Sequence, residues 1–172
     1  NYIQANLDTT LSRKFMPCME PKNAKRYENV EDARLYGFEF AANYRFWKQM
    51  SLYGNWAYTV GENKSMEEPL AEIPPMEVNT GFKYEDKKWI ARFNARFVMA
   101  QDQVSTSFNE STSEAFQVFD LSAHYHIWGG LKLSLNVENI FDENYVEHLS
   151  RAYKNQIPGS NMVYYEPGRN FI

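Results

Sequence analysis

The sequence lacks several features that would assign it to a common class of protein. A single cysteine, Cys18, excludes a disulfide within the chain. The 18 basic residues are fewer than the 22 acidic ones, and the net charge of −4 provides no basic surface for a nucleic acid. No apolar run reaches the roughly 20 residues that a membrane-spanning helix needs. We therefore expect neither nucleic-acid binding nor a helical membrane anchor.

Motifs of hydrolytic or transfer chemistry are also missing. The chain has no nucleophile elbow, no HExxH pair of zinc ligands and no phosphate-binding loop. Glycine and proline are sparse as well, with 8 and 7 residues among 172, and the length suits one domain. We expect a protein that is not an enzyme and that requires no cofactor.

Aromatic residues, in contrast, are abundant, with 12 Tyr, 12 Phe and 4 Trp. Most of them alternate with other residues at a period of two, which is the periodicity of β-strands and not of helices. The alternation predicts a meander of about eight strands. The expected strands are 35–46, 50–60, 78–84, 89–99, 119–127 and 131–138, with a weak first strand at 1–7 and a last strand that begins at Phe171.

The connections between the expected strands alternate between short and long. The short ones are 47–49, 85–87 and 128–130, and each is flanked by aromatic residues. Outer-membrane barrels show this alternation, with short periplasmic turns, long extracellular loops and a girdle of aromatic residues at each interface. The long connections are expected to be polar loops at 12–32, 61–77, 101–115 and 146–165.

Alternation at a period of two does not say which face of the sheet is outside. In a soluble sandwich or barrel the apolar face points inward, whereas in a membrane barrel it meets lipid. The apolar face here is broad and aromatic on strand after strand, which favours a transmembrane antiparallel β-barrel. The polar face mixes charges of both signs, as a wet lumen would, and contains Glu39, Arg45, Arg92, Arg96, Asp120, His124, Lys132 and Glu138.

Three short motifs carry a resemblance to a known family. The segment Asn139-Ile-Phe-Asp-Glu-Asn-Tyr145 resembles the Asn-Leu-Phe-Asp-x-x-Tyr motif at the top of the penultimate strand of TonB-dependent outer-membrane receptors. Glu166-Pro-Gly-Arg-Asn170 is similar to the segment that leads those receptors into their final strand, and Ile73-Pro-Pro75 resembles an upstream Ile-Pro-Pro. The resemblance covers residues 35–172, and the order and spacing of the motifs match.

The resemblance implies a 22-stranded barrel with a plugged lumen in the bacterial outer membrane. Residues 1–172 would be its C-terminal β-barrel segment, with the plug domain and the earlier strands absent and the last strand cut at Ile172. The partners it implies are outer-membrane lipid, the receptor's own plug domain, TonB, and a metal or metal-chelate substrate. The motif residues with an expected structural role are Asn139, Phe141, Asp142, Tyr145, Gly168 and Arg169, of which Arg169 would anchor the last strand.

One predicted loop contains three sulfur-bearing residues close together, Met16, Cys18 and Met19. Thiolate and thioether ligands favour Cu(I), so the cluster is a candidate copper site. The alternative is a loop whose sulfur-bearing side chains only pack under other loops. The segment 145–151 also resembles the copper-receptor branch of the family.

Two further sets of polar-face residues are candidates for ligand contact. His124 and His126 lie two residues apart and therefore share a face, where Asp120 could complete a metal ladder; the alternative is hydrogen bonding to the plug. The arginines Arg45, Arg92 and Arg96 could guide an anionic chelate. Their alternative role is structural pairing with Glu39, Asp120 or plug carboxylates.

Three function classes follow from these observations. The first is a TonB-dependent receptor that takes up a siderophore complex, haem or copper. The second is a passive porin-like barrel or a small structural barrel in the outer membrane. The third is a soluble β-barrel that binds an apolar ligand. The first class requires no cofactor, and a copper or iron chelate would be its transported substrate.

Overall fold

The computed structural model describes residues 2–7, 25–150, 153–154, 161–162 and 165–172. The described chain forms two compact units. The first comprises the described parts of 1–36, 59–73 and 102–112, and the second those of 37–58, 74–101 and 113–172. Every regular element in the described ranges is a β-strand. Among these residues, no helix is long and apolar enough to cross a membrane.

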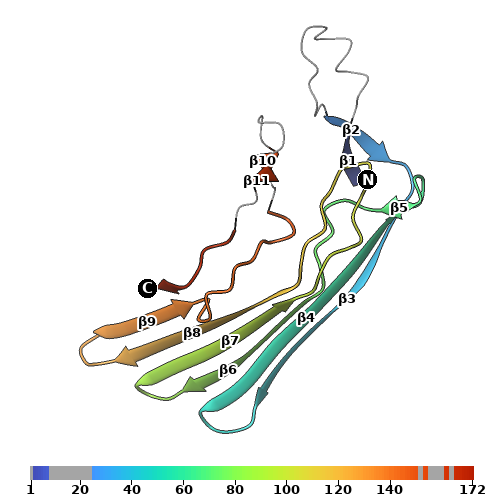
Figure 1. Cartoon of the computed structure of the whole chain (residues 1–172). Helices are drawn as coiled ribbons and strands as arrows, with labels where there is room; N and C mark the ends of the chain where they lie inside the picture. The colour runs from blue at the N-terminus through green and yellow to red at the C-terminus, as the bar shows by residue number, and fades with distance from the viewer. Residues whose placement is uncertain (1, 8–24, 151–152, 155–160, 163–164) are drawn as a thin grey trace. The chain divides into compact units, whose positions relative to one another are not determined.

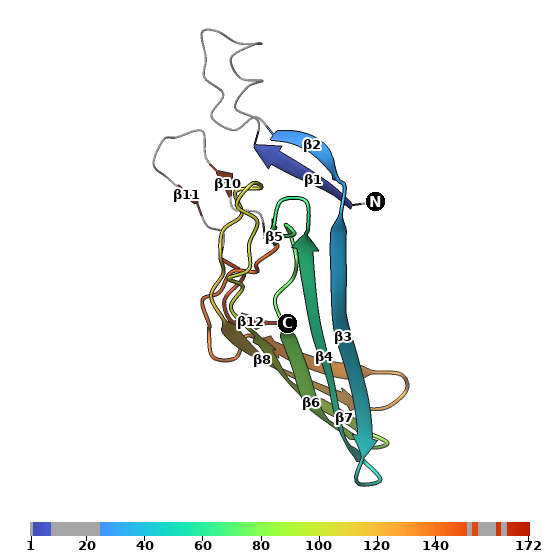
Figure 2. The same cartoon turned by 90° about the vertical axis from the view of Figure 1, so that its right-hand side faces the viewer.

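The main sheet is an antiparallel meander, as the alternation predicts. Its strands follow the order β12-β9-β8-β7-β6-β4-β3, and β5 pairs with β4. The views in Figure 1 and Figure 2 both show β4, β6 and β7 running side by side. The strands are β3 (Ala33–Arg45), β4 (Met50–Asn63), β5 (Glu68–Pro69), β6 (Glu77–Glu85), β7 (Trp89–Val98), β8 (Phe116–His126), β9 (Lys132–Glu138) and β12 (Asn170–Phe171).

Five short strands differ from the sequence prediction or lie outside the main sheet, and one of them, β5, lies in the loop predicted at 61–77. The weak first strand exists as β1 (Tyr2–Leu7), but it pairs with β2 (Lys25–Val30) in a separate hairpin. The prediction of a loop at 25–30 is therefore wrong, because backbone pairing with β1 forms a strand from a mostly polar segment. The pair β10 (Tyr153–Lys154) and β11 (Asn161–Met162) also lies in a predicted loop. Two-residue ladders are too short to leave a periodic pattern.

The register of the sheet gathers the apolar side chains on one face. Leu52 is paired with Phe82, Phe82 with Phe93, Phe93 with Leu121, and Leu121 with Val137. This row crosses five strands without a polar side chain. Three of its members are well exposed, at 49% for Leu52, 39% for Phe93 and 40% for Leu121. The structure therefore presents a continuous apolar face and does not bury it in a core.

Aromatic pairs reinforce this face across neighbouring strands. The rings of Phe38 and Trp56 meet edge to face at 4.8 Å, and those of Phe93 and Phe119 stack at 6.0 Å. Near the short turns, the ring centroids of Trp89 and Tyr125 lie 4.5 Å apart. Such pairs each contribute about 0.5–1.5 kcal/mol beyond the area they bury.

The polar face follows the same register. One row runs from Ser51 to Lys83, Arg92, Ser122 and Asn136 across five strands. The alternating sets that the sequence indicates are therefore the two faces of one sheet. Residues two apart on a strand share a face, and the register between neighbouring strands aligns like faces. The alternating pattern of each strand therefore continues across the sheet.

The short turn after β6 is organised by Asp86. Its carboxylate accepts hydrogen bonds from the backbone N–H groups of Lys88 and Trp89, each at 2.7 Å, and from the Tyr84 hydroxyl at 2.8 Å. The bonds from Trp89 and Lys88 hold the pKa of Asp86 below its usual value. The turn after β8 instead places Gly129 and Gly130 at φ of 56° and 85°, a region that glycine occupies without strain.

A small apolar core closes the long-connection end of each unit. In the second unit, Val98, Phe116 and Val118 are buried and Tyr145 packs against them. In the first unit, Leu70 and Ile73 are buried. A Cβ on Gly61 would lie 2.8 Å from Ile73 Cδ1, so glycine permits this close packing.

Candidate functional site

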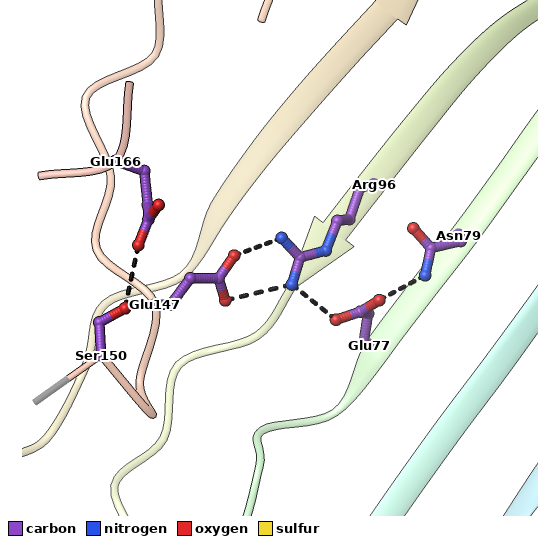
Figure 3. Close-up of polar contacts among 6 residues, drawn as sticks. All are labelled: Glu77, Asn79, Arg96, Glu147, Ser150 and Glu166. Atoms are coloured by element: carbon purple, nitrogen blue, oxygen red, sulfur yellow. Dashed lines mark hydrogen bonds and ion pairs between the residues drawn. The ribbon is translucent and has the colours of Figure 1, made fainter. Parts of the chain in front are cut away.

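Arg96 joins two carboxylates at the long-connection end of the polar face. It lies in β7, in register with Asn79 of β6. Its Nη2 atom is 2.8 Å from Glu77 Oε2 and 3.1 Å from Glu147 Oε2, and its Nη1 atom donates to Glu147 Oε1. Figure 3 shows the guanidinium between the strand carboxylate and the loop carboxylate. The two parallel bonds to Glu147 form a bidentate ion pair, which fixes geometry as well as charge.

The segment that carries Glu147 is fastened at further points. Tyr145 stacks on Phe116 at 4.3 Å, and the Phe116 ring lies 5.4 Å from the Arg96 guanidinium carbon. The Ser150 hydroxyl donates to Glu166 at 2.9 Å, as Figure 3 also shows. Residues 143–150, which we call the strap, are thus tied to the ends of β7 and β8 and to the segment that precedes β12.

The pairing of Arg96 bears on its predicted role in ligand guidance. Two carboxylates surround its guanidinium, so its positive charge is already neutralised. The alternative of structural pairing describes this geometry, although the partners are Glu77 and Glu147 and not Glu39 or Asp120. Sequence reasoning missed both partners, because a contact between a strand end and a distant loop leaves no local pattern.

Asn139 and its neighbours form a polar corner where β9 ends. Asn139 is 3% exposed, and its backbone N–H donates to Asp120 Oδ1 at 2.9 Å. Its side-chain amide donates to the carbonyl oxygen of Glu143 at 2.9 Å and accepts a bond from the Glu143 N–H at 2.8 Å. A weaker contact of 3.4 Å reaches the carbonyl of Pro167. The corner thus turns the chain out of β9 and holds the segment that leads to β12.

Asp142 links the same corner to the Pro-Gly-Arg segment. Its Oδ1 accepts the backbone N–H of Arg169 at 2.8 Å, and a Cβ on Gly168 would lie 2.6 Å from that oxygen. Phe141 points elsewhere, since it is 69% exposed and meets Phe119 of the apolar face at 5.2 Å. The structure therefore brings the residues of the two motifs together as a connection between β9 and β12.

The predicted histidine site contains a pair of histidines on one face of the sheet. His124 and His126 lie on the same face, and the Nδ1 atom of His124 is 3.0 Å from the Ser134 hydroxyl. Asp120 is engaged by Asn139. The described part of the chain holds no group of three or more His, Cys, Asp or Glu side chains suited to a metal. Metal binding by the two histidines stays a prediction.

The remaining candidates are two arginines of the polar face and the three sulfur-bearing loop residues. Arg45 lines a pocket of about 270 Å³ near the short turn between β3 and β4, and Arg92 is in register with Lys83. The loop residues Met16, Cys18 and Met19 lie outside the described residues.

A second polar cluster, within the first unit, has no counterpart in the sequence prediction. Glu68 accepts hydrogen bonds from the hydroxyls of Ser105 at 2.9 Å, Thr106 at 2.8 Å and Ser107. The N–H groups of Thr106 and Ser107 add two bonds of 3.2 Å. Burial opposes ionisation of Glu68, but the bonds from Ser107 and Thr106 outweigh it and lower the pKa to about 2. The cluster ties the connection after β4 to the connection after β7.

The fold and these contacts define a class of protein. An antiparallel meander with one exposed apolar face and one polar face has the architecture of a membrane β-barrel wall. A family model described as "TonB dependent receptor-like, beta-barrel" matches residues 1–140. The chain belongs to this family, whose members are transport receptors, and the resemblance predicted from the three motifs is confirmed.

The names of two curated relatives refer to different substrates. The chain is 30% identical over 132 residues to the heme/hemopexin utilization protein C of Haemophilus influenzae, a match covering 73% of this chain and 18% of that protein. It is 27% identical over 156 residues to the metal-pseudopaline receptor CntO of Pseudomonas aeruginosa, covering 84% and 21%. The chain therefore spans about a fifth of the length of these relatives.

Among solved structures, the copper transporter OprC is similar in both sequence and fold. The identity is 33% and the TM-score 0.78, over 86% of this chain and 24% of that one. This similarity supports the predicted antiparallel barrel wall over a soluble β-barrel.

Proposed function

We propose that this chain forms part of the wall, lumen lining and extracellular loops of a bacterial outer-membrane receptor that takes up a metal or metal chelate. The exposed aromatic face carries the proposal. The apolar row from Leu52 to Val137 crosses five strands, and three of its side chains are well exposed. Exposure of such a face to water is unfavourable, whereas contact with lipid is favourable. Membership of the receptor family supports the same conclusion.

The orientation in the membrane follows from the connections. Short turns with flanking aromatic side chains, such as the pair Trp89 and Tyr125, would lie at the periplasmic interface. The strap and the Asn139 corner would then lie on the extracellular side. There, a substrate would first meet loops whose positions are fixed by ion pairs and hydrogen bonds.

Within the full-length receptor, this chain would supply scaffold and not motion. A rigid wall and fastened loops hold ligand-contacting groups in place, whereas gating would come from a plug domain coupled to TonB. The charge pairing of Arg96 fits this division, because it fixes the strap against β6 and β7.

Copper is the substrate that this chain's own residues favour. Met16, Cys18 and Met19 offer soft ligands suited to Cu(I), and the similarity to the copper transporter OprC points the same way. Titration of copper into the full-length receptor should give weaker binding for Cys18→Ser than for the unsubstituted protein. Equal binding by the two proteins would remove copper from the proposal and leave haem or another chelate.

Uptake measurements test the receptor proposal itself. Cells that carry the full-length receptor should accumulate labelled copper, haem or a ferric chelate only when TonB is functional. Uptake that persists without TonB would indicate a passive barrel. Recovery of the receptor as a monodisperse protein without detergent would indicate a soluble β-barrel.

A further inference from the structure

A polar pocket lies at the short-turn end of the polar face, far along the strands from the strap. Its volume is about 270 Å³, and it is built from the end of β3, the following turn, the start of β4 and the end of β6. These three strands are neighbours in the sheet, as Figure 1 shows. The pocket therefore belongs to one continuous part of the wall.

The lining of this pocket consists almost entirely of hydrogen-bond donors. A guanidinium, two ammonium groups, two amides and a hydroxyl all carry N–H or O–H bonds. The single carboxylate of the lining, Glu85, forms an ion pair with Lys83 and is thereby neutralised. The donor residues are Asn43, Arg45, Lys48, Gln49, Ser51 and Lys83.

Two cationic side chains of the pocket take no part in the ion pair between Lys83 and Glu85. Within the part of the chain that the structure describes, no carboxylate lies within ion-pair distance of Arg45 or Lys48. Arg96, at the other end of the polar face, is in contrast held by two carboxylates. Arg45 therefore differs from Arg96, because its guanidinium forms no ion pair with a described carboxylate and can offer its charge to a ligand.

We propose that this pocket binds a small oxyanion, a molecule that presents carboxylate or phosphate oxygens. A guanidinium matches such oxygens with two parallel N–H bonds, and an ammonium adds a compact positive charge. The amides of Asn43 and Gln49 and the hydroxyl of Ser51 supply neutral donors around them. The volume of about 270 Å³ accommodates an anion of the size of phosphate or citrate.

This site goes beyond uptake of a metal, because it lies at the opposite end of the strands from the extracellular loops. Under the proposed orientation it faces the periplasmic end of the lumen. Its binding chemistry does not depend on which metal or chelate the receptor transports. A failed oxyanion test would therefore leave the uptake proposal standing, and the reverse also holds.

Calorimetric titration of the full-length receptor in detergent, at pH 7 and low salt, tests the site with citrate and with inorganic phosphate as probes. Saturable binding of one equivalent is expected. Arg45→Gln and Lys48→Gln should each weaken binding by about tenfold or more, since each removes a charge-assisted hydrogen bond. Both side chains are exposed, so neither substitution should disturb the fold.

Lys87→Gln is the matched control. Lys87 is an exposed lysine in the next short turn, and it does not line the pocket. The Lys87→Gln substitution changes the net charge by the same amount as Arg45→Gln or Lys48→Gln, and it should leave binding unchanged. Arg45→Lys provides a second variant that retains the charge and should bind more tightly than Arg45→Gln. Absence of saturable binding to both probes, or an equal loss in Lys87→Gln, would overturn the proposal.

Discussion

Replacement of Glu147 by glutamine should loosen the strap, residues 143–150, without unfolding the sheet. The substitution keeps the shape of the side chain and removes the charge that faces Arg96. The two side chains are each 29% exposed, so their bidentate pair is screened in part by solvent. Between the values for buried charged hydrogen bonds and for exposed ion pairs, we expect a loss of roughly 1–1.5 kcal/mol in local stability.

Hydrogen exchange of the strap amides measures this loss. A local opening free energy lowered by that amount corresponds to exchange that is about five- to twelvefold faster. Amides in the middle of β7 should not change. Arg96→Gln should have a larger effect, since it leaves both Glu77 and Glu147 without their cation, and the double variant should lose less than the sum of the two single variants.

Glu114→Gln provides the control for charge alone. Glu114 is an exposed residue of the same unit, and no described residue forms an ion pair with it. If Glu147→Gln exchanges no faster in the strap than Glu114→Gln, the ion pair does not hold the strap and the reasoning fails.

Three further predictions concern close packing and pH. Gly81→Ala should lower the unfolding temperature of the receptor, because its Cβ would lie 2.7 Å from the Phe93 carbonyl oxygen; overpacking of this kind costs about 1–3 kcal/mol. Gly168→Ala should speed amide exchange at Arg169, because its Cβ would displace the Asp142 carboxylate that accepts that N–H. The pKa of Glu68 lies at about 2 in the fold, below its ordinary value of 4.5, so its bonds stabilise the fold above pH 4.5. Protection of the Thr106 and Ser107 amides should therefore be constant near neutral pH and be lost as the pH falls from about 4.5 towards 2.

Each of these predictions has its own comparison. Gly54→Ala should cost less than Gly81→Ala, since its nearest contact is 3.1 Å, and an equal or larger loss would contradict the packing argument. Amide exchange at Lys88, which depends on Asp86, should not respond to Gly168→Ala. Glu68→Gln should remove the pH dependence at Thr106 and Ser107; a persistent transition in that variant would show that another group titrates there.

The sequence is sufficient to predict the long strands of the main sheet and their two faces. Alternation of apolar and polar residues is a local property of each strand. Because one whole face of the sheet contacts the same environment, the same alternation recurs on every neighbouring strand. The start of β8 shows where this fails. The strand begins at Phe116, whereas the alternation predicts a start at 119. The prediction misses the first residues because Phe116 and Val118 are apolar residues on the polar face, where they are buried with Tyr145. Their burial by a distant loop interrupts the alternation.

The contacts of the candidate site are less accessible to sequence reasoning. Arg96 can be placed on the polar face, but its partner Glu147 lies 51 residues later, in a segment outside the strands. Glu68 and its three hydroxyl donors show no periodicity at all. The motif residues Asn139 and Asp142 could be identified only by family resemblance, because their bonds to distant backbone groups depend on the completed topology.

The membrane assignment of the two faces can be measured directly with a fluorescent label at Leu121 or at Ser122 in the reconstituted full-length receptor. These neighbours in β8 lie on opposite faces, Leu121 in the apolar row and Ser122 in the polar row. A label at 121 should be quenched by brominated lipid and protected from a water-soluble quencher, whereas a label at 122 should escape lipid quenching. Lipid quenching at 122 and none at 121 would contradict the account.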